Sequence, residues 1–369
     1  MKKSLSVGTV LCLLIAILLS GCSNNGEKSE GKENGKNLKV AFLYDSPVGD
    51  GGWITSHDLG RKAVEEMDGV DTTYVDNISE SDGWSYMNNF AKENYDLIFA
   101  CSFGYMQDCV DVSEKNPETV FMHCAGYMTT DNMGNYFGKN FEASYLAGMA
   151  CAGVSKSGII GYVGPFPIAE VIRNVNAFAL GVKAVNPEAV VKVVWINAWY
   201  DPTLASEAAE SLISSGADAL AHYENSPAVV QTAEKHGVYA VGQHSDAKSY
   251  AENYCLTSTI WNWEKLYTSV VEEVKAGTWK PEAVWWGMKE GLVDIAELNP
   301  AIPDEVANKI QDVRQRLKDG DPKAAPYYGE VKDQSGKVRI ADGVDATYDE
   351  LMNMDYLVDN IDGEITAKE

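Results

Sequence analysis

Short runs of β-branched and aromatic residues recur along the first third of the chain. They cover residues 39–44, 72–76, 96–100 and 119–124, and the segments between them carry apolar residues at helical spacing. Short strands that alternate with amphipathic helices are typical of βαβ units, whose strands form a parallel sheet. We therefore expect this part of the chain to form one α/β lobe.

The same alternation starts again after residue 157 and predicts a second lobe of similar size. Helix starts are marked there by a capping residue before a proline, as in Asp201-Pro202 and Asn186-Pro187, because proline is well accepted at the first helical position. The predicted strands of this second lobe cover residues 158–164, 190–196, 219–223 and 238–243.

Beyond residue 257 the pattern predicts a helix over 263–275, a strand over 284–288 and a helix over 303–317, too few elements for a third sheet. We expect them to return to the two lobes. The fold class is therefore α/β, with two Rossmann-like lobes of parallel strands joined by a multi-strand hinge. The expected division is 38–155 with about 262–283 for the first lobe, 156–261 with about 284–320 for the second, and 321–369 for an extension packed on the lobes.

The N-terminus has the pattern of a lipoprotein export signal. Lys2 and Lys3 precede an apolar stretch over residues 7–19, and Ser20-Gly21 stands directly before Cys22. The stretch is too short for a membrane-spanning helix, which needs about 20 apolar residues. We expect residues 1–21 to be removed, Cys22 to carry the lipid, and residues 22–37, which are rich in Gly, Asn, Glu and Lys, to form a flexible tether.

The charge balance excludes a nucleic-acid partner. The 369 residues include 30 Lys and Arg against 54 Asp and Glu, a net charge of −24, and no basic cluster is present. Phosphate affinity depends on clustered Lys and Arg. Loss of residues 1–21 removes two lysines and leaves a net charge of −26, so the exported part is more acidic than the whole.

Five cysteines remain after Cys12 and Cys22 are set aside. An odd number without a CxxC pair excludes a complete disulfide framework and zinc-ligand spacing, although a single bridge stays open. Most of these cysteines lie in apolar runs, so we interpret them as small buried residues. They are Cys101, Cys109, Cys124, Cys151 and Cys255.

Sequence signatures of enzymes are missing. The chain has no GxxxxGK[ST], GxSxG, HExxH or GxGxxG pattern. The segments His222-Tyr-Glu224 and His244-Ser-Asp246 each pair a histidine with an acid at a strand end, which leaves a metal or acid/base cluster as the minor alternative to ligand hydrogen bonding or a structural role. We predict no catalytic residue, no metal site and no cofactor.

A glycine-rich loop, Val48-Gly49-Asp50-Gly51-Gly52-Trp53, follows the first strand, where open α/β sheets bind ligands. Such a loop can hold a phosphate. Asp50 within it and Asp45 before it would repel that charge, so a neutral or cationic ligand fits better.

Aromatic residues also follow predicted strands in both lobes. Rings presented by two lobes can stack on both faces of a planar ligand, at about 1–3 kcal/mol per ring. Core packing is the alternative for about half of them, but Trp53 and Trp199 lie in polar turn sequences. The candidate stacking residues are Trp53, Phe103 and Tyr105 in the first lobe and Phe166, Trp199, Tyr200, Tyr223 and Trp261 in the second.

Seven segments in order, spread over nearly the whole mature chain, resemble the basic membrane protein family, the lipoprotein substrate-binding subunits of ABC importers. The resemblance implies a type I periplasmic-binding-protein fold and a purine nucleoside or related ligand held between two closing lobes. The segments are GDGGW, GKNFEASYLAGMACAG, IIGYVGPFPIAEVIRNVNAFALGVKAVNP, NAWYDPTLASEAAESLISSGADAL, VGQHSDA, TSTIWNWE and WWGMKEGLVDIA.

The resemblance carries over only in part. The family's acid after the first strand is nearest to Asp45, offset by one residue, and its DKSFN loop becomes DGGWI, so Trp53 replaces a stacking Phe. Trp199 falls where the opposite ring is expected. A ribose-binding acid in GxDSD falls on His244, and a sugar-binding lysine falls on Trp261.

These replacements predict a free purine base, adenine or an oxopurine, rather than a nucleoside. An indole cannot bind two ribose hydroxyls, and an unpaired ribose would leave buried polar groups unsatisfied. Acids and amides near strand ends would then bind the edge of the base; the candidates are Asp45, Asn140, Glu224, Gln243 and Asp246.

The resemblance also implies partners. An ABC permease and its ATPase are expected to be separate chains, since this sequence has neither transmembrane helices after the signal nor a phosphate loop. We expect a monomer outside the cytoplasmic membrane, attached only through its lipid. A nucleoside ligand within the same family, a ligand-sensing receptor and a nucleoside-processing enzyme remain as alternatives, and pyranose sugars can also stack on indoles.

Overall fold

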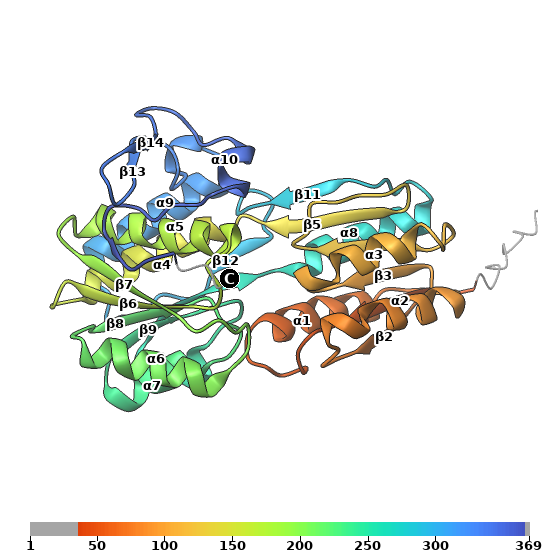
Figure 1. The fold of residues 1–369 in the computed structure, drawn as a ribbon, viewed down its shortest axis with the longest axis horizontal. Coiled ribbons are helices and arrows are strands. Elements are labelled where there is room, and N and C mark those ends of the chain that lie inside the picture. Colours follow the sequence, from red (N-terminus) through yellow and green to blue (C-terminus); the bar gives the residue numbers. More distant parts are fainter. Residues whose placement is uncertain (1–35, 366–369) are drawn as a thin grey trace, which may run out of the picture. The chain divides into compact units, whose positions relative to one another are not determined.

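The computed structural model describes residues 36–365, so the expected signal peptide, Cys22 and most of the expected tether lie outside the described residues. Two sheets, the first parallel and the second parallel except for one edge strand, are each covered by helices and form the two lobes (Figure 1). The α/β fold with two Rossmann-like lobes is confirmed. No helix among residues 36–365 is both long enough and apolar enough to cross a membrane.

The first lobe contains a six-stranded parallel sheet in the order β11-β5-β4-β3-β1-β2. Its strand β3 is apolar and fully buried, and β1 is buried over its last four residues, as expected for strands with helices on both faces. The strands are β1 (Leu38–Leu43), β2 (Val70–Val75), β3 (Leu97–Ala100), β4 (Val120–Cys124), β5 (Met133–Gly138) and β11 (Ala283–Trp286), and the helices are α1 (Trp53–Glu65), α2 (Gly83–Lys92), α3 (Met106–Ser113) and α8 (Trp263–Ala276).

The second lobe contains a seven-stranded sheet in the order β12-β10-β9-β8-β6-β7-β15, in which β12 alone runs antiparallel to its neighbour. Its strands are β6 (Ile159–Gly164), β7 (Val190–Trp195), β8 (Ala219–His222), β9 (Tyr239–Gly242), β10 (Cys255–Trp261), β12 (Val293–Ile295) and β15 (Ile361–Asp362). Its helices are α4 (Asn140–Val154), α5 (Ala169–Val185), α6 (Pro202–Ser214), α7 (Ala228–His236) and α9 (Asp304–Lys318).

Two elements lie in the opposite lobe from the one that the sequence analysis gave them. Helix α4 packs against α5, α9 and strands β9 and β10, because it is apolar on nearly all sides and becomes a central helix of the second lobe. Strand β11 pairs with β5 and so belongs to the first sheet. We therefore propose lobe boundaries near residues 139, 262 and 290.

The chain passes between the lobes after β5, after β10 and between β11 and β12. These passages lie close together: Lys139 N donates to Trp286 O at 2.8 Å, and Asn262 N donates to Leu292 O at 2.8 Å. Gly138 is required here because a Cβ on it would lie 2.3 Å from the Trp261 ring. The passages form the expected multi-strand hinge.

One expected helix start is wrong. Asn186-Pro187 ends α5 instead of opening a helix, because β7 begins only three residues later and the Asn186 side chain accepts from Glu188 N in a tight turn. Asp201-Pro202 does open α6, with the Asp201 carboxylate accepting from Thr203 N and Leu204 N.

Residues 321–365 pack on the second lobe. They form a short hairpin of β13 (Val331–Lys332) and β14 (Val338–Ile340), the helix α10 (Tyr348–Met352), and β15, which pairs with β7. Buried side chains of α5 fasten this extension: Arg173 Nη1 donates to Leu351 O at 2.7 Å, and Asn176 Nδ2 donates to Tyr356 O at 2.7 Å.

The cysteines among the described residues form no disulfide. Cys101, Cys109, Cys124, Cys151 and Cys255 are all buried and free, so the single bridge that the sequence left open is absent between these five. Burial raises the pKa of the Cys101 thiol to about 12, which keeps it protonated and unreactive.

Candidate functional site

A cavity lies between the lobes, where the carboxyl ends of strands from both sheets meet. Its empty space, including its opening to solvent, is about 390 Å³, within the range of small-molecule pockets. Nearly every lining residue stands just after a strand, at the ligand-binding edge of an open α/β sheet. The first lobe contributes Asp45, Trp53, Ser102, Phe103 and Ala125, and the second contributes Glu170, Trp199, Tyr223, Asn225 and His244.

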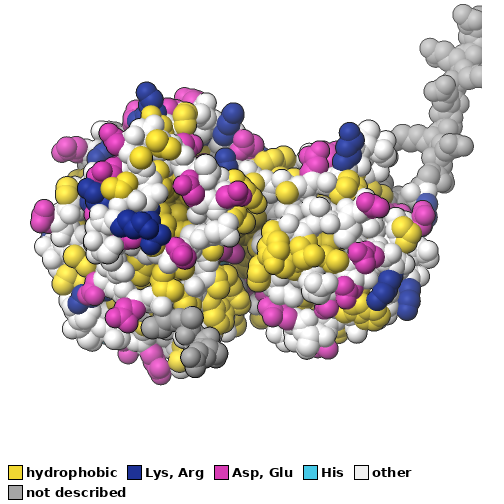
Figure 2. Space-filling view, turned by 45° about the horizontal axis from the view of Figure 1, so that its top comes forward, with side chains coloured by type: hydrophobic (Ala, Val, Ile, Leu, Met, Phe, Trp, Pro, Cys, Tyr) yellow, Lys and Arg dark blue, Asp and Glu magenta, His cyan; other side chains and the backbone are white. Residues whose placement is uncertain are grey.

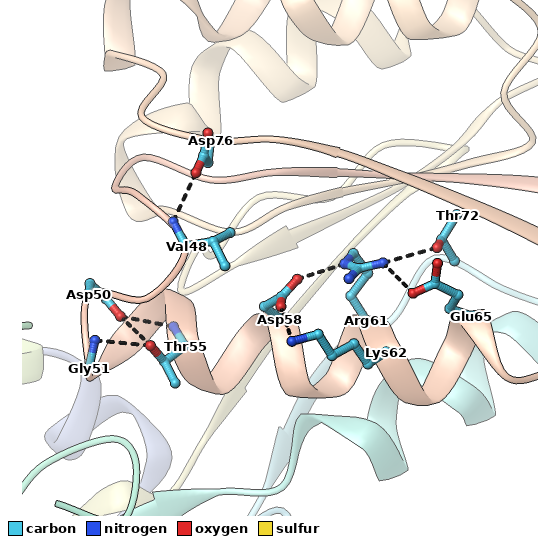
Figure 3. Close-up of polar contacts among 10 residues, drawn as sticks. All are labelled: Val48, Asp50, Gly51, Thr55, Asp58, Arg61, Lys62, Glu65, Thr72 and Asp76. Atoms are coloured by element: carbon cyan, nitrogen blue, oxygen red, sulfur yellow. Dashed lines mark hydrogen bonds and ion pairs between the residues drawn. The ribbon is translucent and has the colours of Figure 1, made fainter.

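The glycine-rich loop is closed by its own acid. Asp50 accepts hydrogen bonds from Gly52 N, Ile54 N and Thr55 N, each at 2.9 Å. It also accepts from the Thr55 hydroxyl, and Figure 3 shows its contacts with Thr55. These are the amides at the start of α1 that a bound phosphate would need. Asp50 therefore caps the helix and lies outside the cavity lining.

Gly51 and Gly52 allow the lobes to touch. A Cβ on Gly52 would lie 2.3 Å from Asn225 O, and one on Gly51 would lie 3.1 Å from the Pro227 ring. The Ser245 hydroxyl, from the second lobe, donates to Gly51 O at 2.9 Å. The two glycines thus allow the lobes to approach each other closely. The described conformation is closed at this point.

Trp53 is fixed in the floor of the cavity at the first residue of α1. Its Nε1 donates to Cys101 O at 3.0 Å, and the side chain is 8% exposed. The rings of His57, Trp261 and Trp263 meet it edge to face, with centroid distances of 4.3, 5.8 and 5.6 Å. An indole held this way can present one face to a ligand without a loss of rotamer freedom on binding.

His244 presents a single hydrogen-bond donor. Trp261 Nε1 donates to His244 Nδ1 at 3.0 Å, so the remaining proton of the neutral ring resides on Nε2. That Nε2 is buried and has no partner among the described residues. Burial lowers the His244 pKa to about 3, with repulsion from His222 adding to the effect, so the ring is neutral at any ordinary pH.

Asp45 presents a free acceptor. Its Oδ2 accepts from the Ser102 hydroxyl at 2.7 Å, while its Oδ1 is buried without a partner among the described residues. Burial raises the pKa of this carboxyl to about 6, and the hydrogen bond from Ser102 opposes that rise only in part. The cavity therefore holds one unpaired acceptor from the first lobe and one unpaired donor from the second.

The second lobe supplies the opposite aromatic wall. Trp199, in the loop after β7, lines the cavity and contacts Phe166, with ring centroids 5.3 Å apart. Phe166 supports Trp199 from outside the lining.

Tyr223 and Glu170, which both line the cavity, form a hydrogen-bonded pair. The Tyr223 hydroxyl donates to Glu170 at 3.0 Å, and burial raises the Glu170 pKa.

Of the residues expected to bind ligand, Asp45, Trp53, Phe103, Trp199 and His244 line the cavity. The others lie around it or away from it, and most of their polar groups are paired within the protein, Asn140 Nδ2 being an exception. They are Asp50, Asn140, Phe166, Glu224, Asp246 and Trp261.

Glu224 and Asp246 have local structural contacts. The Glu224 carboxylate accepts from Ser226 N and from the Ser226 hydroxyl, and lies 3.3 Å from His222 Nδ1. Asp246 is exposed and accepts from Lys248 N. No group of three metal-ligating side chains is found among residues 36–365, so neither histidine–acid pair extends to a metal centre there.

Asn140 and Trp261 lie one layer below the lining. Asn140 Oδ1 accepts from Gln243 Nε2 at 3.1 Å at the start of α4, and its Nδ2 has no partner among the described residues. Trp261 stacks on Trp263, with centroids 4.6 Å apart, and orients His244.

Tyr223, a candidate stacking residue, also lines the cavity, and four lining residues were not expected to bind ligand: Ser102, Ala125, Glu170 and Asn225. Tyr223 and Asn225 flank the expected Glu224, because successive side chains beyond a strand point to opposite sides. Nothing in the sequence marks Ala125 as a lining residue. In the structure Ala125 and His244 both have left-handed backbone, with φ of 63° and 70°. Left-handed backbone at non-glycine residues is costly and concentrates at functional sites.

Comparisons with known proteins identify the family of the chain. The family model for ABC transporter substrate-binding proteins of the PnrA-like type (Bmp) matches residues 37–320. A purine-binding protein of Brucella abortus is 36% identical over 359 residues, covering 96% of this chain and 99% of the relative. A protein of Haloferax volcanii, provisionally named an ABC transporter glucose-binding protein, is 40% identical over 289 residues, covering 78% of this chain and 74% of the relative.

Solved structures show the same fold. A solute-binding protein of an ABC transporter system from Aeropyrum pernix superposes with a TM-score of 0.69 at 18% identity, covering 80% of this chain and 93% of that one. The family model spans both lobes and therefore includes the cavity residues between them. The chain belongs to the Bmp family of ABC transporter substrate-binding proteins.

Proposed function

We propose that this substrate-binding protein captures a free purine base between its lobes and delivers it to an ABC permease. One observation carries the proposal: the cavity pairs a free acceptor, Asp45 Oδ1, with a free donor, His244 Nε2–H, between indoles from opposite lobes. A purine base has two flat faces and an edge on which donors and acceptors alternate. It would satisfy both buried groups and stack on both rings.

The polarity of the cavity favours an uncharged ligand. The α1 amides are taken by Asp50, and Asp45 and Glu170 both line the cavity, so a phosphate would meet acids and no free helix end. The large negative net charge acts in the same direction. These features support a base or nucleoside over a nucleotide.

The choice of base over nucleoside rests on His244 and Trp261. These residues stand where the family resemblance places a ribose-binding acid and lysine, and they bind each other instead. The pair leaves one imidazole N–H toward the cavity, whereas two vicinal hydroxyls need a group that can bind both. A nucleoside would therefore bring hydroxyl groups that find too few partners.

Glucose is the second candidate, because the Haloferax volcanii relative carries a name that assigns it glucose binding. Asp45, Glu170 and Asn225 are side chains that also suit sugar hydroxyls, and a pyranose can lie on Trp53 or Trp199. The single donor of His244 and the aromatic wall of the second lobe favour the flat base.

Two measurements test the proposal. Mass spectrometry of the small molecules released on denaturing gently purified protein should detect adenine or an oxopurine. Titration calorimetry should then rank adenine, hypoxanthine and guanine above adenosine and glucose by at least tenfold. A nucleoside as the dominant released species, or glucose binding more tightly than every base, contradicts the proposal.

The remaining assignments complete the proposed role. We expect cleavage before Cys22, lipid attachment at Cys22, and a monomer that works outside the cytoplasmic membrane with a separate permease and ATPase. Palmitate labelling of the wild-type chain and of a Cys22→Ala variant in the native host tests the anchor. Incorporation that persists in the variant would contradict it.

A further inference from the structure

A second cavity adjoins the first. The two share Phe103, Ala125 and Glu170, and the second has about 1,020 Å³ of empty space, including its opening. It lies between strands β5 and β11 of the first lobe and the start of α5 with helix α10 of the extension. Tyr348 and Met352 of α10 form part of its wall. The extension, which lies beyond the family match at residue 320, therefore helps to build this cavity.

The walls are mainly hydrophobic and open to solvent. Four of the large hydrophobic side chains that the described residues leave exposed line this one cavity: Phe103, Tyr127, Ile168 and Tyr348. Tyr127 is 67% exposed and Tyr348 is 46% exposed. Figure 2 shows hydrophobic side chains gathered on both sides of the constriction between the lobes. Such clustering marks a binding surface.

Two buried donors at the wall have no acceptor. Arg173 is 1% exposed, and while its Nη1 donates to Leu351 O, its Nε has no partner among the described residues. Trp285 Nε1 is likewise buried without a partner there, and the guanidinium lies 5.9 Å from the Trp285 ring centroid. Unpaired buried donors of this kind are rare.

We propose that this second cavity is a subsite for a substituent carried by the purine, so that the ligand class is purines with an apolar or aromatic substituent. The inference rests on the proposed function. The three shared residues make the two cavities continuous, and Ala125 at the junction offers only a methyl group. An aromatic or branched aliphatic group fits these walls, and an acceptor atom on it suits Arg173 and Trp285.

Titration calorimetry with adenine, 6-benzylaminopurine and 9-benzyladenine tests the subsite, because the two benzyl positions sample opposite edges of the ring. At least one benzyl compound should bind within tenfold of adenine. Tyr348→Ala should weaken that compound at least fivefold more than it weakens adenine; the comparison between ligands is needed because Tyr348 also contacts Trp285 of the other lobe. Val344→Ala, an exposed change in the same extension outside the cavity lining, serves as the matched control and should alter neither.

The outcomes separate the two proposals. Adenine binding with both benzyl compounds weaker by more than tenfold overturns the subsite and leaves the proposed function standing. A benzyl compound that binds equally well to wild type, Tyr348→Ala and Val344→Ala also overturns it. Failure of every purine to bind overturns the proposed function itself. Melting temperatures of both variants within a few degrees of wild type establish that they fold.

Discussion

At the scale of single residues, His244 and Trp261 act as a pair. Neither is typical of the family pattern that the sequence resembles, and the structure joins them by one hydrogen bond, Trp261 Nε1 to His244 Nδ1. The pair fixes the tautomer of the histidine and gives the cavity a neutral donor in place of charges. The sequence identified both positions, but only their contact explains why both differ.

Trp53→Ala should weaken purine binding at least tenfold in titration calorimetry, because one stacked ring contributes about 1–3 kcal/mol. Trp53→Phe keeps a ring in the same place and should retain most of the affinity. Because Trp53 also packs in the core, the melting temperature of each variant must be measured first. Unchanged affinity of folded Trp53→Ala would remove Trp53 from the site.

Asp45 should make ligand affinity depend on pH. Its pKa is raised from 3.8 to about 6, so in the ligand-free protein it gains a proton as the pH falls through 6 and loses its role as an acceptor for a purine N–H. Affinity is expected to fall from pH 7 to pH 5 and to be flat above pH 7. Asp45→Asn should abolish this dependence.

A pH dependence that survives in Asp45→Asn would point to a different group. The candidate is Glu142 at the hinge, which accepts from Met288 N and whose pKa burial raises to about 7. The stability of the ligand-free protein should depend on pH in the opposite direction from the affinity. The native state favours protonated Asp45, so its contribution is lost as the pH rises from about 4 to 6.

At the scale of elements, most strands could be predicted because runs such as 39–44 and 190–196 combine β-branched residues with short length. Strand β5 could not, because Met-Gly-Asn-Tyr-Phe-Gly has weak β propensity and is held by pairing with β4 and β11. The sequence predicted most of the loops that form the site. The sequence could not say which side chain in each loop turns inward, as Glu224 between Tyr223 and Asn225 illustrates.

Gly52→Ala tests the closed arrangement of the α1 loop. Gly52 is the residue before the first turn of α1, and a Cβ added to it would lie 2.3 Å from Asn225 O of the second lobe. We expect purine affinity to fall at least tenfold with little change in melting temperature, because only the closed state is hindered. In small-angle scattering with ligand present, Gly52→Ala should have a larger radius of gyration than the wild-type protein.

Ser245→Ala provides the comparison for that variant. It removes only the hydrogen bond to Gly51 O and adds no atom, so it should weaken binding less than Gly52→Ala does. Equal affinities of Gly52→Ala and wild type would show that closure at this loop is not needed for binding.

At the scale of the whole molecule, the lobes meet on two sides of the paired cavities. On one side Gly51 and Gly52 contact the second lobe, and on the other the ring of Tyr348 in the extension lies edge-on to Trp285 of the first lobe, with centroids 4.8 Å apart. The extension thus packs on the second lobe, and through this contact it also joins the two lobes in the closed state.

Asn176→Ala should destabilise the protein through the extension. Its buried amide donates to Tyr356 O and accepts from Val358 N, and loss of both bonds should lower the free energy of unfolding by about 2–3 kcal/mol in urea titrations. The control is Lys183→Ala, which breaks a solvent-exposed ion pair with Asp359 and should cost under about 1 kcal/mol. Similar losses of unfolding free energy in both variants would contradict the argument that the buried hydrogen bonds stabilise the extension more than the exposed ion pair does.

The stacked indoles of Trp261 and Trp263 have a consequence for observing the protein at work. Their centroids are 4.6 Å apart with planes 11° from parallel, and they stand on either side of Asn262, where the chain passes from one lobe to the other. Two indoles this close couple their electronic transitions, and the resulting circular dichroism couplet depends on the angle between them. The hinge therefore contains a natural optical reporter, able to follow opening and closing in unlabelled protein.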